Sequence, residues 1–373
     1  MDIVVGAGIA GIACARRLAE HGRMVRVLER KPFIGGSCRD VYDENGILIH
    51  PCGPHIFHTN NDDVWAFLSR FTEWTLFRHK VVAKIGATLL PVPFNLHALE
   101  IVYGKTKAAE IEEKLVSRWG AGARVPILDL QNEEDPDLHA VAKFVYENIF
   151  LKYTVKLWGR RPEEIDASVM ARVPVVLSRD DEYFTEKYQG VPKDGYTRMM
   201  KAMLAHDNIM VETGTDYMGG ADGDGHTVYT GAIDELCDRT FGSLPYRSIR
   251  FETEYHDMDD YQGRSVVNYT VSEDFTRITE FKHLTQQAGV HGTTIMREYP
   301  TQYEEGEGLT PFYPIRDEES NALYEKYVTL LSDKPRFHLL GRLAEYRYYN
   351  MDDAVQRALA LADDIAAQEQ TDK

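Results

Sequence analysis

Cysteine is scarce in this chain of 373 residues, which has only four. The four are Cys14, Cys38, Cys52 and Cys237, and none forms a C-x-x-C pair with another. Their spacing therefore predicts no zinc site, and we expect no bound metal. A strand-like run starts at Asp2, where a signal peptide would have its apolar segment, so we expect a cytoplasmic protein with reduced thiols. Such thiols usually act as small buried hydrophobes.

An excess of basic residues and long apolar runs are also missing. The chain has 42 Lys and Arg against 59 Asp and Glu, a formal net charge of −17. This charge disfavours DNA, RNA and anionic lipid as partners. No stretch approaches the roughly 18 consecutive apolar residues of a membrane helix. We therefore expect neither a nucleic-acid nor a membrane partner, and an anionic substrate would require Arg or Lys at its site.

The first residues form a dinucleotide-binding pattern of strand, glycine turn and helix. The run Ile3 to Val5 leads into Gly6-Ala7-Gly8-Ile9-Ala10-Gly11, and an Ala-rich segment follows. At this spacing Gly6 makes a tight turn, Gly8 lets a pyrophosphate approach, and Gly11 allows helix and strand to pack closely. The N-terminus of the following helix then offers free N–H groups to the phosphates.

Two features beyond the glycines favour FAD. Glu29 ends the next predicted strand, 18 residues after Gly11, where its carboxylate can accept hydrogen bonds from a ribose. An acid at this position disfavours the 2′-phosphate of NADP. The pair Gly35-Gly36 follows and resembles the second glycine pair of FAD proteins of the glutathione-reductase and amine-oxidase type. A tight turn without a nucleotide remains the alternative.

The pattern of the remaining chain predicts an α/β protein: a Rossmann-like FAD-binding domain with an inserted helical domain and an antiparallel β-sheet domain. Apolar stripes at helical spacing fill the middle, and short β-like runs follow. The expected FAD-binding domain comprises residues 1–75, 193–242 and 315–373. The expected helical domain is 95–150, and the expected sheet domain comprises 76–94, 151–192 and 243–314.

Further segments, in order along nearly the whole chain, resemble the UDP-galactopyranose mutase family. They include Gly53-Pro54-His55-Ile56-Phe57-His58-Thr59, Tyr153-Thr154 through Trp158-Gly159-Arg160, Arg172-Val173-Pro174, Tyr246-Arg247-Ser248, Thr276-Arg277-Ile278, Phe312-Tyr313-Pro314 and Gly341-Arg342-Leu343. The resemblance implies an isomerase that interconverts UDP-galactopyranose and UDP-galactofuranose with no net redox change. Its cofactor would be reduced FAD, whose N5 attacks the anomeric carbon while UDP leaves. It also implies a homodimer.

The resemblance also implies roles for individual residues. The catalytic residues would be Arg172 and Arg277, which hold the diphosphate, and His58 beside the flavin; the segment around Arg172 would be a mobile lid. The implied substrate-binding residues are Phe150, Tyr153, Trp158, Tyr183, Asn268, Tyr313 and Tyr348. The implied cofactor-binding residues are Gly6, Gly8, Gly11, Glu29, Gly35, Gly36, His55, Gly341, Arg342, Asn350 and Met351.

The sequence departs from the family pattern at a few of these places. Asn350 stands where the family usually has Asp, and it could instead cap the final helix, with Asp353 three residues on. The family's Gly-Gly-Asn-Ala-Tyr is here Gly-Gly-Ser-Cys-Arg, ending at Arg39. Pro54 and Val176 replace a common Ala and a common Arg. These changes leave open a mutase for another NDP-hexose, and a flavin oxidase of the amine-oxidase type or a non-catalytic FAD module remain rivals.

Overall fold

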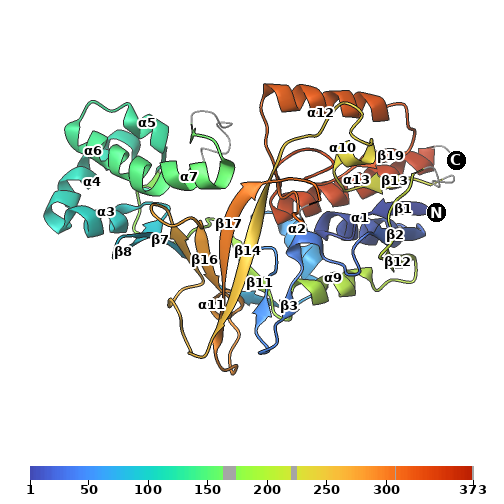
Figure 1. Cartoon of the computed structure of the whole chain (residues 1–373), viewed down its shortest axis with the longest axis horizontal. Coiled ribbons are helices and arrows are strands. Elements are labelled where there is room, and N and C mark those ends of the chain that lie inside the picture. The colour runs from blue at the N-terminus through green and yellow to red at the C-terminus, as the bar shows by residue number, and fades with distance from the viewer. Residues whose placement is uncertain (163–173, 220–224, 307, 372–373) are drawn as a thin grey trace. The chain divides into compact units, whose positions relative to one another are not determined.

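The computed structural model describes residues 1–162, 174–219, 225–306 and 308–371. The chain divides into two compact units (Figure 1). The first consists of Met1–Phe77, Glu186–Ser248 and Glu305–Lys373, and the second of Arg78–Thr185 and Ile249–Glu304. In the described part of the chain, no helix is both long and apolar enough to cross a membrane.

A five-stranded sheet forms the centre of the first unit. Its strand order is β12-β2-β1-β13-β19, and every neighbouring pair is parallel. The strands are β1 (Asp2–Val5), β2 (Val25–Glu29), β12 (Ile209–Thr213), β13 (Thr227–Tyr229) and β19 (Phe337–Leu339). Chain order reverses on the two sides of β1, so the glycine turn after β1 lies at the topological switch point where such sheets bind nucleotides.

Helices cover this sheet. The central ones are α1 (Ile9–Glu20), α9 (Tyr196–Leu204) and α13 (Met351–Thr371), and α1 packs closely against α13 (Figure 1). Ala10, Ala13, Ala358 and Ala362 are all buried in the core there. Small side chains at these places let the two helix axes approach, as close packing requires.

Shorter elements complete the first unit. They are η1 (Gly36–Cys38), β3 (Val41–Tyr42), β4 (Leu48–Ile49), β5 (Phe57–Thr59), α2 (Asp62–Ser69), β6 (Trp74–Leu76), β11 (Tyr188–Pro192), α10 (Ile233–Leu236), β18 (Tyr313–Pro314) and α12 (Glu318–Leu331). Strands β5, β11 and β6 form a small antiparallel sheet. Strand β14 (Tyr246–His256) begins in this unit, where it pairs with β18.

The second unit combines helices with a mixed sheet. Its strands include β7 (Val81–Ile85), β8 (Thr88–Val92), β15 (Val266–Tyr269), β16 (Arg277–Glu280) and β17 (Thr293–Gln302), and β9 (Arg124–Pro126) pairs with β10 (Pro174–Val176). The sheet was expected to be antiparallel, and most of its pairs are, but β15 runs parallel to β7. About 180 residues separate these two strands in sequence, so no tight turn fixes their relative direction.

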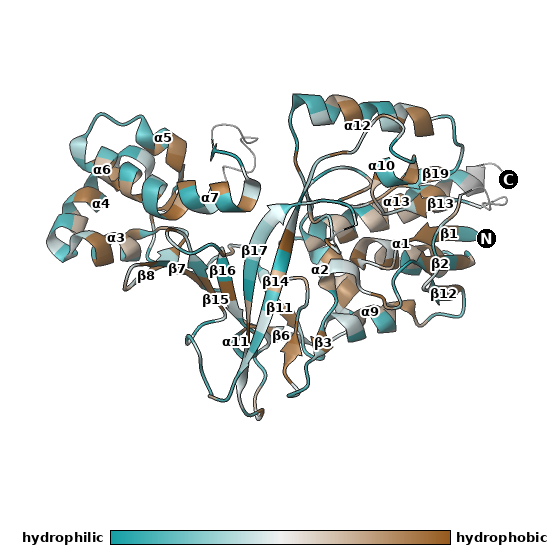
Figure 2. Cartoon of the chain, in the orientation of Figure 1, coloured by the Kyte–Doolittle hydropathy of each residue, from teal (hydrophilic) through white to brown (hydrophobic). Residues whose placement is uncertain are grey.

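The helices of the second unit are α3 (Leu96–Tyr103), α4 (Lys105–Trp119), α5 (Ile127–Gln131), α6 (Pro136–Val145), the π-helical turn η2 (Tyr146–Phe150), α7 (Leu151–Trp158) and α11 (Phe281–Thr285). They carry both apolar and polar residues (Figure 2), as amphipathic helices do. Their apolar side chains share one core with strands of the sheet. The separate helical domain 95–150 therefore stays a prediction, as do the other domain boundaries.

A buried histidine, His50, and a half-buried one, His338, make the stability of the first unit depend on pH. Burial lowers the pKa of His50 from 6.5 to about 3, and burial lowers that of His338 to about 4. His50 Nδ1 accepts a hydrogen bond from the backbone N–H of His55 at 3.1 Å, so this nitrogen carries no proton. Between these pKa values and 6.5 the unfolded chain binds protons that the folded chain does not.

We therefore expect the free energy of unfolding to fall as the pH drops from 6.5 toward 4. The fully buried His50 contributes a slope of about 1.4 kcal/mol per pH unit. His50→Asn keeps an acceptor but cannot titrate, so urea melts at several pH values should show a flatter profile for this variant. An unchanged slope would contradict the assignment of His50.

Candidate active site

The glycine turn after β1 is shaped to receive a phosphate. Helix α1 starts after Gly8 with no side-chain cap and no acidic residue in its first turn, so neither a capping side chain nor a like charge competes with an anion for its first N–H groups. A Cβ on Gly11 would lie 2.1 Å from the carbonyl oxygen of Gly6, and a Cβ on Gly8 would have only the Gly36 Cα near it, at 4.0 Å. Gly11 thus permits the tight turn, while Gly8 leaves space above it.

The second glycine pair lies directly beside the first. The N–H of Gly35 donates to the carbonyl of Ala7 at 2.7 Å, and Gly8 and Gly35 form a parallel bridge. A Cβ on Gly36 would stand 3.1 Å from the Gly8 Cα. Two glycine segments that are distant in sequence therefore form one side-chain-free cradle at the helix N-terminus, and this cradle fits the diphosphate of a dinucleotide.

Glu29 is fixed where β2 ends. Its side chain is buried, and its two carboxylate oxygens accept the backbone N–H groups of Ala7 at 2.8 Å and Lys31 at 2.9 Å. These bonds hold the carboxylate beside the glycine turn. Each oxygen retains a second lone pair, so the ribose contact predicted for Glu29 is compatible with this geometry.

A cation lies against two stacked aromatic rings in the same unit. Tyr313 and Tyr348 are stacked, with ring centroids 5.9 Å apart and an interplanar angle of 10°. The Arg342 guanidinium carbon lies 5.1 and 4.9 Å from these two centroids, and Arg342 donates to the carbonyls of Phe312 and Tyr349. The structure thus brings together three residues that the resemblance assigned to cofactor and phosphate contacts.

The glycine before Arg342 connects this cluster to the dinucleotide cradle. Gly341 has a φ of +90°, and a Cβ there would meet the Ala10 Cβ on the first turn of α1 at 3.5 Å. The charge of Arg342 also acts to lower the pKa of Cys38, which burial raises to about 12. Gly341 and Arg342 therefore lie close to both glycine segments.

The two predicted flavin histidines have different partners. His55 donates from Nδ1 to the carbonyl of Gly53 at 2.8 Å, within its own loop. His58 lies on β5, mostly buried, and its Nδ1 is 3.0 Å from a carboxylate oxygen of Glu186. The carboxylate fixes the orientation of the His58 ring, as carboxylates do for functional imidazoles.

In the second unit, Asn268, Arg277 and Glu298 form one cross-strand row. Asn268 on β15 stands opposite Arg277 on β16, which stands opposite Glu298 on β17. Residues directly opposite each other point to the same face of a sheet, so the three side chains are neighbours. Arg277 Nε lies 2.7 Å from Glu298 Oε1, and the Glu298 side chain is only 2% exposed.

This row has the features of a binding site for an anion with polar edges. The Asn268 Oδ1 is buried without a hydrogen-bond partner among the described residues. A buried amide oxygen without a partner costs free energy, so a ligand donor there would be favourable. Glu298 lies against the Arg277 guanidinium, and a guanidinium has the planar shape that suits a bidentate phosphate contact.

Four predicted substrate aromatics also belong to this unit. Tyr153 and Trp158 lie on α7, and both are partly buried. Tyr183 packs edge to face on His79 and Phe184 and borders the core. Phe150 is 2% exposed and its side chain belongs to that core. Phe150 thus contributes packing beneath the site, and its substrate contact stays a prediction.

The remaining predicted residues are placed as follows. Arg172, with its predicted lid, lies outside the described residues. Asn350 precedes α13, whose first residue is Met351, and its N–H donates to Asp353 at 3.1 Å, so Asn350 occupies the N-cap position of that helix. Val176 is buried on β10 and bonds to the Phe94 carbonyl.

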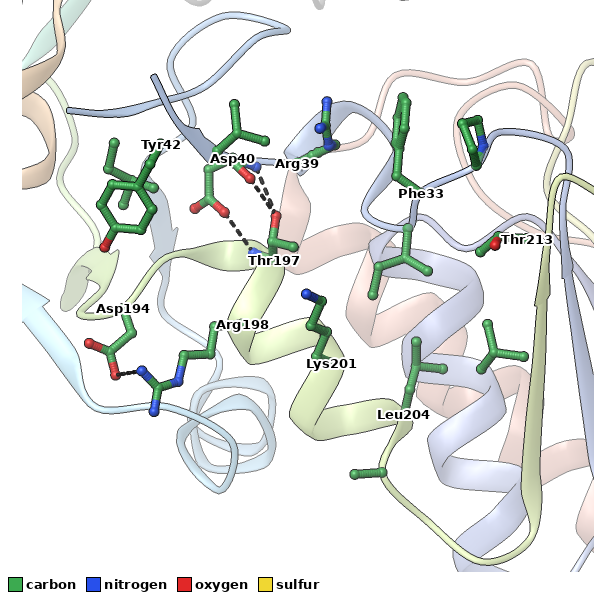
Figure 3. A pocket seen from close by; sticks show the side chains of 16 residues that line it. Phe33, Arg39, Asp40, Tyr42, Asp194, Thr197, Arg198, Lys201, Leu204 and Thr213 are labelled. Atoms are coloured by element: carbon green, nitrogen blue, oxygen red, sulfur yellow. Dashed lines mark hydrogen bonds and ion pairs between the residues drawn. The ribbon is translucent and has the colours of Figure 1, made fainter. Parts of the chain in front are cut away.

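A pocket of about 860 Å³ lies in the first unit, between α9, the edge strand β12 and the loop that leads to Asp40 (Figure 3). Asp40 accepts the backbone N–H groups of Tyr196 and Thr197 and so caps α9, while Asp194 pairs with Arg198. Arg39 stacks on Phe33, with its guanidinium carbon 4.0 Å from the ring centroid. None of the predicted cofactor-binding residues lines this pocket, so it is distinct from the dinucleotide cradle.

Comparison with known proteins agrees with this geometry. A model of a NAD(P)-binding Rossmann-like domain matches residues 4–71. A family model described as UDP-galactopyranose mutase matches residues 148–348, more than half of the chain. The chain belongs to the UDP-galactopyranose mutase family. The Rossmann-like domain and this family membership imply a flavin cofactor, which the glycine cradle fits.

Relatives of this mutase family match over nearly the whole chain. A probable UDP-galactopyranose mutase of Klebsiella pneumoniae is 36% identical over 366 residues, 97% of this chain and 94% of that protein. A dTDP-fucopyranose mutase of Escherichia coli is 35% identical over 370 residues, 96% of this chain and 97% of that protein. The family and the predicted fold class are thereby confirmed.

Solved structures show the same fold. The crystal structure of a reduced UDP-galactopyranose mutase has a TM-score of 0.73 and 16% identity, covering 98% of this chain and 94% of that one. A putrescine oxidase bound to putrescine has a TM-score of 0.56 and 13% identity, covering 98% of both chains. At such identities the likeness concerns the fold alone, so it does not favour oxidase chemistry.

In each unit, some residues that contact the predicted site residues carry no sequence signal of their own. Glu298 and Glu186 orient Arg277 and His58, yet each lies in a run without a motif. Arg247 belongs to the quoted Tyr-Arg-Ser segment, but only the structure shows that it is buried opposite Tyr313. Burial lowers the pKa of Arg247.

Proposed function

We propose that this protein is a flavin-dependent mutase that interconverts UDP-galactopyranose and UDP-galactofuranose. The observation that carries the proposal is the row Asn268–Arg277–Glu298. A guanidinium there pairs with a buried carboxylate, beside an amide oxygen that is buried and has no hydrogen-bond partner within the described part of the chain. A nucleoside diphosphate offers phosphate oxygens to the first and hydroxyl or N–H donors to the second. Family membership supplies the reaction type.

A local cation is essential because the whole chain repels the substrate. The net charge is −17, so a diphosphate gains nothing from the overall field. We assign Arg277 the role of neutralising the diphosphate as it departs from the sugar. Arg172, by family resemblance, would be the second cation and would close over the substrate.

A reduced FAD would supply the nucleophile, its N5, for the anomeric carbon while UDP leaves. The residues of this chain then have three tasks. Gly6, Gly8, Gly11, Gly35 and Gly36 leave the space in which its diphosphate binds. Glu29 and His55 are assigned to the same cofactor, while His58, oriented by Glu186, offers an imidazole for a hydrogen bond or a proton.

Aromatic side chains are assigned to the rest of the substrate. Tyr153, Trp158 and Tyr183 supply flat apolar surface for a uracil base. Tyr313 and Tyr348 are assigned to the phosphates, and the Arg342 guanidinium contacts both rings. A homodimer and a cytoplasmic location, both expected from the sequence, stay predictions.

A related mutase acting on another NDP-hexose is the second candidate. It is favoured by the 35% identity to a dTDP-fucopyranose mutase and by Asn350, which removes a carboxylate where the family usually has one. Asn350 stands at the N-cap position of α13, and a neutral side chain there changes the charge beside the assigned cofactor site.

Matched turnover assays separate the two candidates. Dithionite-reduced, FAD-loaded protein is given UDP-galactofuranose and dTDP-fucofuranose in parallel, and products are separated by chromatography. We expect kcat/KM to be at least about tenfold higher for the UDP sugar, the difference that one well-placed polar contact provides. A reversed preference would assign the chain to the second candidate, and peroxide release with no isomerisation would indicate an oxidase.

A further inference from the structure

Lys156 on α7 makes bonds that are unusual for a lysine. Its Nζ donates to three backbone carbonyl oxygens, those of Tyr269 at 2.6 Å, Glu273 at 2.9 Å and Phe275 at 3.2 Å. An ammonium group has three N–H donors, enough for one bond to each of these carbonyls, which lie in or beside a single short turn. Charge-assisted bonds of this kind are about twice as strong as neutral ones.

The turn that Lys156 binds is the one that leads to Arg277. It joins β15, which ends at Tyr269, to β16, which begins at Arg277. Lys156 holds a carbonyl at the start of the turn, one in its middle and one two residues before Arg277. The backbone hydrogen bond from Tyr269 N–H to the Thr276 carbonyl closes the same turn at 2.8 Å.

A second bond ties the same two segments together. The Thr270 hydroxyl donates to the carbonyl of Asn148 at 2.5 Å. Asn148 lies in the π-helical turn η2, which leads directly into α7. A π-helical turn leaves backbone carbonyls without their regular partners and is often found at functional sites. The helix and the turn are therefore joined at two points, through Lys156 and through Thr270.

Both joined segments carry residues assigned to the substrate. Helix α7 carries Tyr153 and Trp158, and the turn is flanked by Asn268 and Arg277. Burial lowers the pKa of Lys156, while the carboxylates of Glu273 and Asp274 act to raise it. Lys152, one helical turn earlier, is exposed and has no assigned bond among the described residues, so Lys156 is distinguished by its contacts.

We propose that Lys156 is a positioning residue that sets Arg277 for the diphosphate by fastening the turn before it to the helix that carries the aromatic residues. The proposal rests on the proposed function, because it gives Arg277 a phosphate to bind. Without the ammonium group, three carbonyls lose their donors at once and the turn can take other conformations. The Arg277 side chain would then spend less time in its row with Glu298 and Asn268.

The test compares the affinities of FAD-loaded variants for UDP and for uridine by isothermal titration calorimetry. Lys156→Met keeps the apolar stem and removes the donors. We expect UDP to bind about tenfold more weakly, the effect of losing charge-assisted bonds, while uridine affinity changes less than about twofold. Lys152→Met, which removes an exposed cation from the same helix, should leave both affinities unchanged.

A double-mutant cycle shows whether Lys156 acts through Arg277. In an Arg277→Ala background, Lys156→Met should weaken UDP binding by less than about twofold, because two residues that act as one unit are not additive. Lys156→Arg should restore part of the affinity, since a guanidinium can still donate to carbonyls. Lys156→Gln is the second variant if Lys156→Met does not retain its flavin absorbance.

Three outcomes would overturn the proposal: unchanged UDP affinity, an equal loss for uridine and UDP, or an undiminished effect in the Arg277→Ala background. The proposed function fails separately. If the wild-type protein binds no UDP, or Arg277→Ala leaves UDP affinity unchanged, the diphosphate role of Arg277 is wrong. If Arg277→Ala weakens UDP binding and Lys156→Met does not, only the role of Lys156 is wrong.

Discussion

Arg277→Ala is expected to lower kcat/KM for the nucleotide sugar by about a hundredfold to a thousandfold, the loss seen when one preorganised donor to a developing charge is removed. The guanidinium is held by Glu298, whose carboxylate is 2% exposed. Truncation therefore removes the cation and leaves Glu298 buried as an unpaired negative charge next to where the diphosphate would bind. Steady-state kinetics on reduced protein measure this effect.

Arg297→Ala is the matched control for this prediction. Arg297 lies on β17 next to Glu298, opposite Ile278, so it points to the other face of the same sheet. It pairs with Glu254, which is about half exposed, and surface ion pairs of this kind contribute little to stability. Activity should stay near the wild-type value. Flavin absorbance per chain should be unchanged in both variants, because the cradle is in the other unit; wild-type kinetics for Arg277→Ala would contradict the assignment.

Gly11→Ala is expected to abolish flavin retention and to lower the free energy of unfolding by about 3 kcal/mol. The new Cβ would stand 2.1 Å from the Gly6 carbonyl oxygen and 3.3 Å from a Val4 methyl group. The first contact is with backbone, which cannot rotate away, so the turn and the start of α1 must separate. The N–H groups that are assigned to the phosphates would move with them.

Gly46→Ala shows how much of that loss is due to steric overlap. Gly46 has a φ of +77° and no heavy atom within 4 Å of an added Cβ. An alanine at this position therefore lowers the free energy of unfolding only by the cost of its left-handed backbone conformation, about 1 kcal/mol. Flavin content after gel filtration and a urea melt report both quantities. If Gly11→Ala retains flavin as Gly46→Ala does, the close contact at the glycine turn is not what shapes the cradle.

The dinucleotide-binding half of the site could be predicted because its signals are contiguous. Gly6, Gly8 and Gly11 act within one turn, and Glu29 follows at the end of the next strand, so spacing alone carries the geometry. The structure confirms the predicted Rossmann-like strand and helix order around them. The parallel pairing of β15 with β7 was missed because it depends on tertiary contacts between distant segments.

The predicted substrate residues of the second unit depend on the register of strand pairing and on bonds to backbone atoms. Glu298 joins Arg277 only because β16 and β17 pair with these two residues opposite each other, and a shift by one residue would place Arg297 there instead. Lys156 binds carbonyl oxygens, which every residue type has, so no pattern of side chains could indicate it. The family resemblance pointed to Arg277, but only the structure shows that Glu298 and Lys156 hold it and the turn before it.

Product analysis with UDP-galactofuranose tests the central claim most directly. Purified protein, reduced with dithionite, is mixed with the sugar nucleotide beside an oxidised sample of the same preparation. We expect UDP-galactopyranose in the reduced sample alone, with no net consumption of reductant per turnover. No conversion by reduced protein that still holds its flavin would contradict it and would exclude UDP-galactose as the substrate.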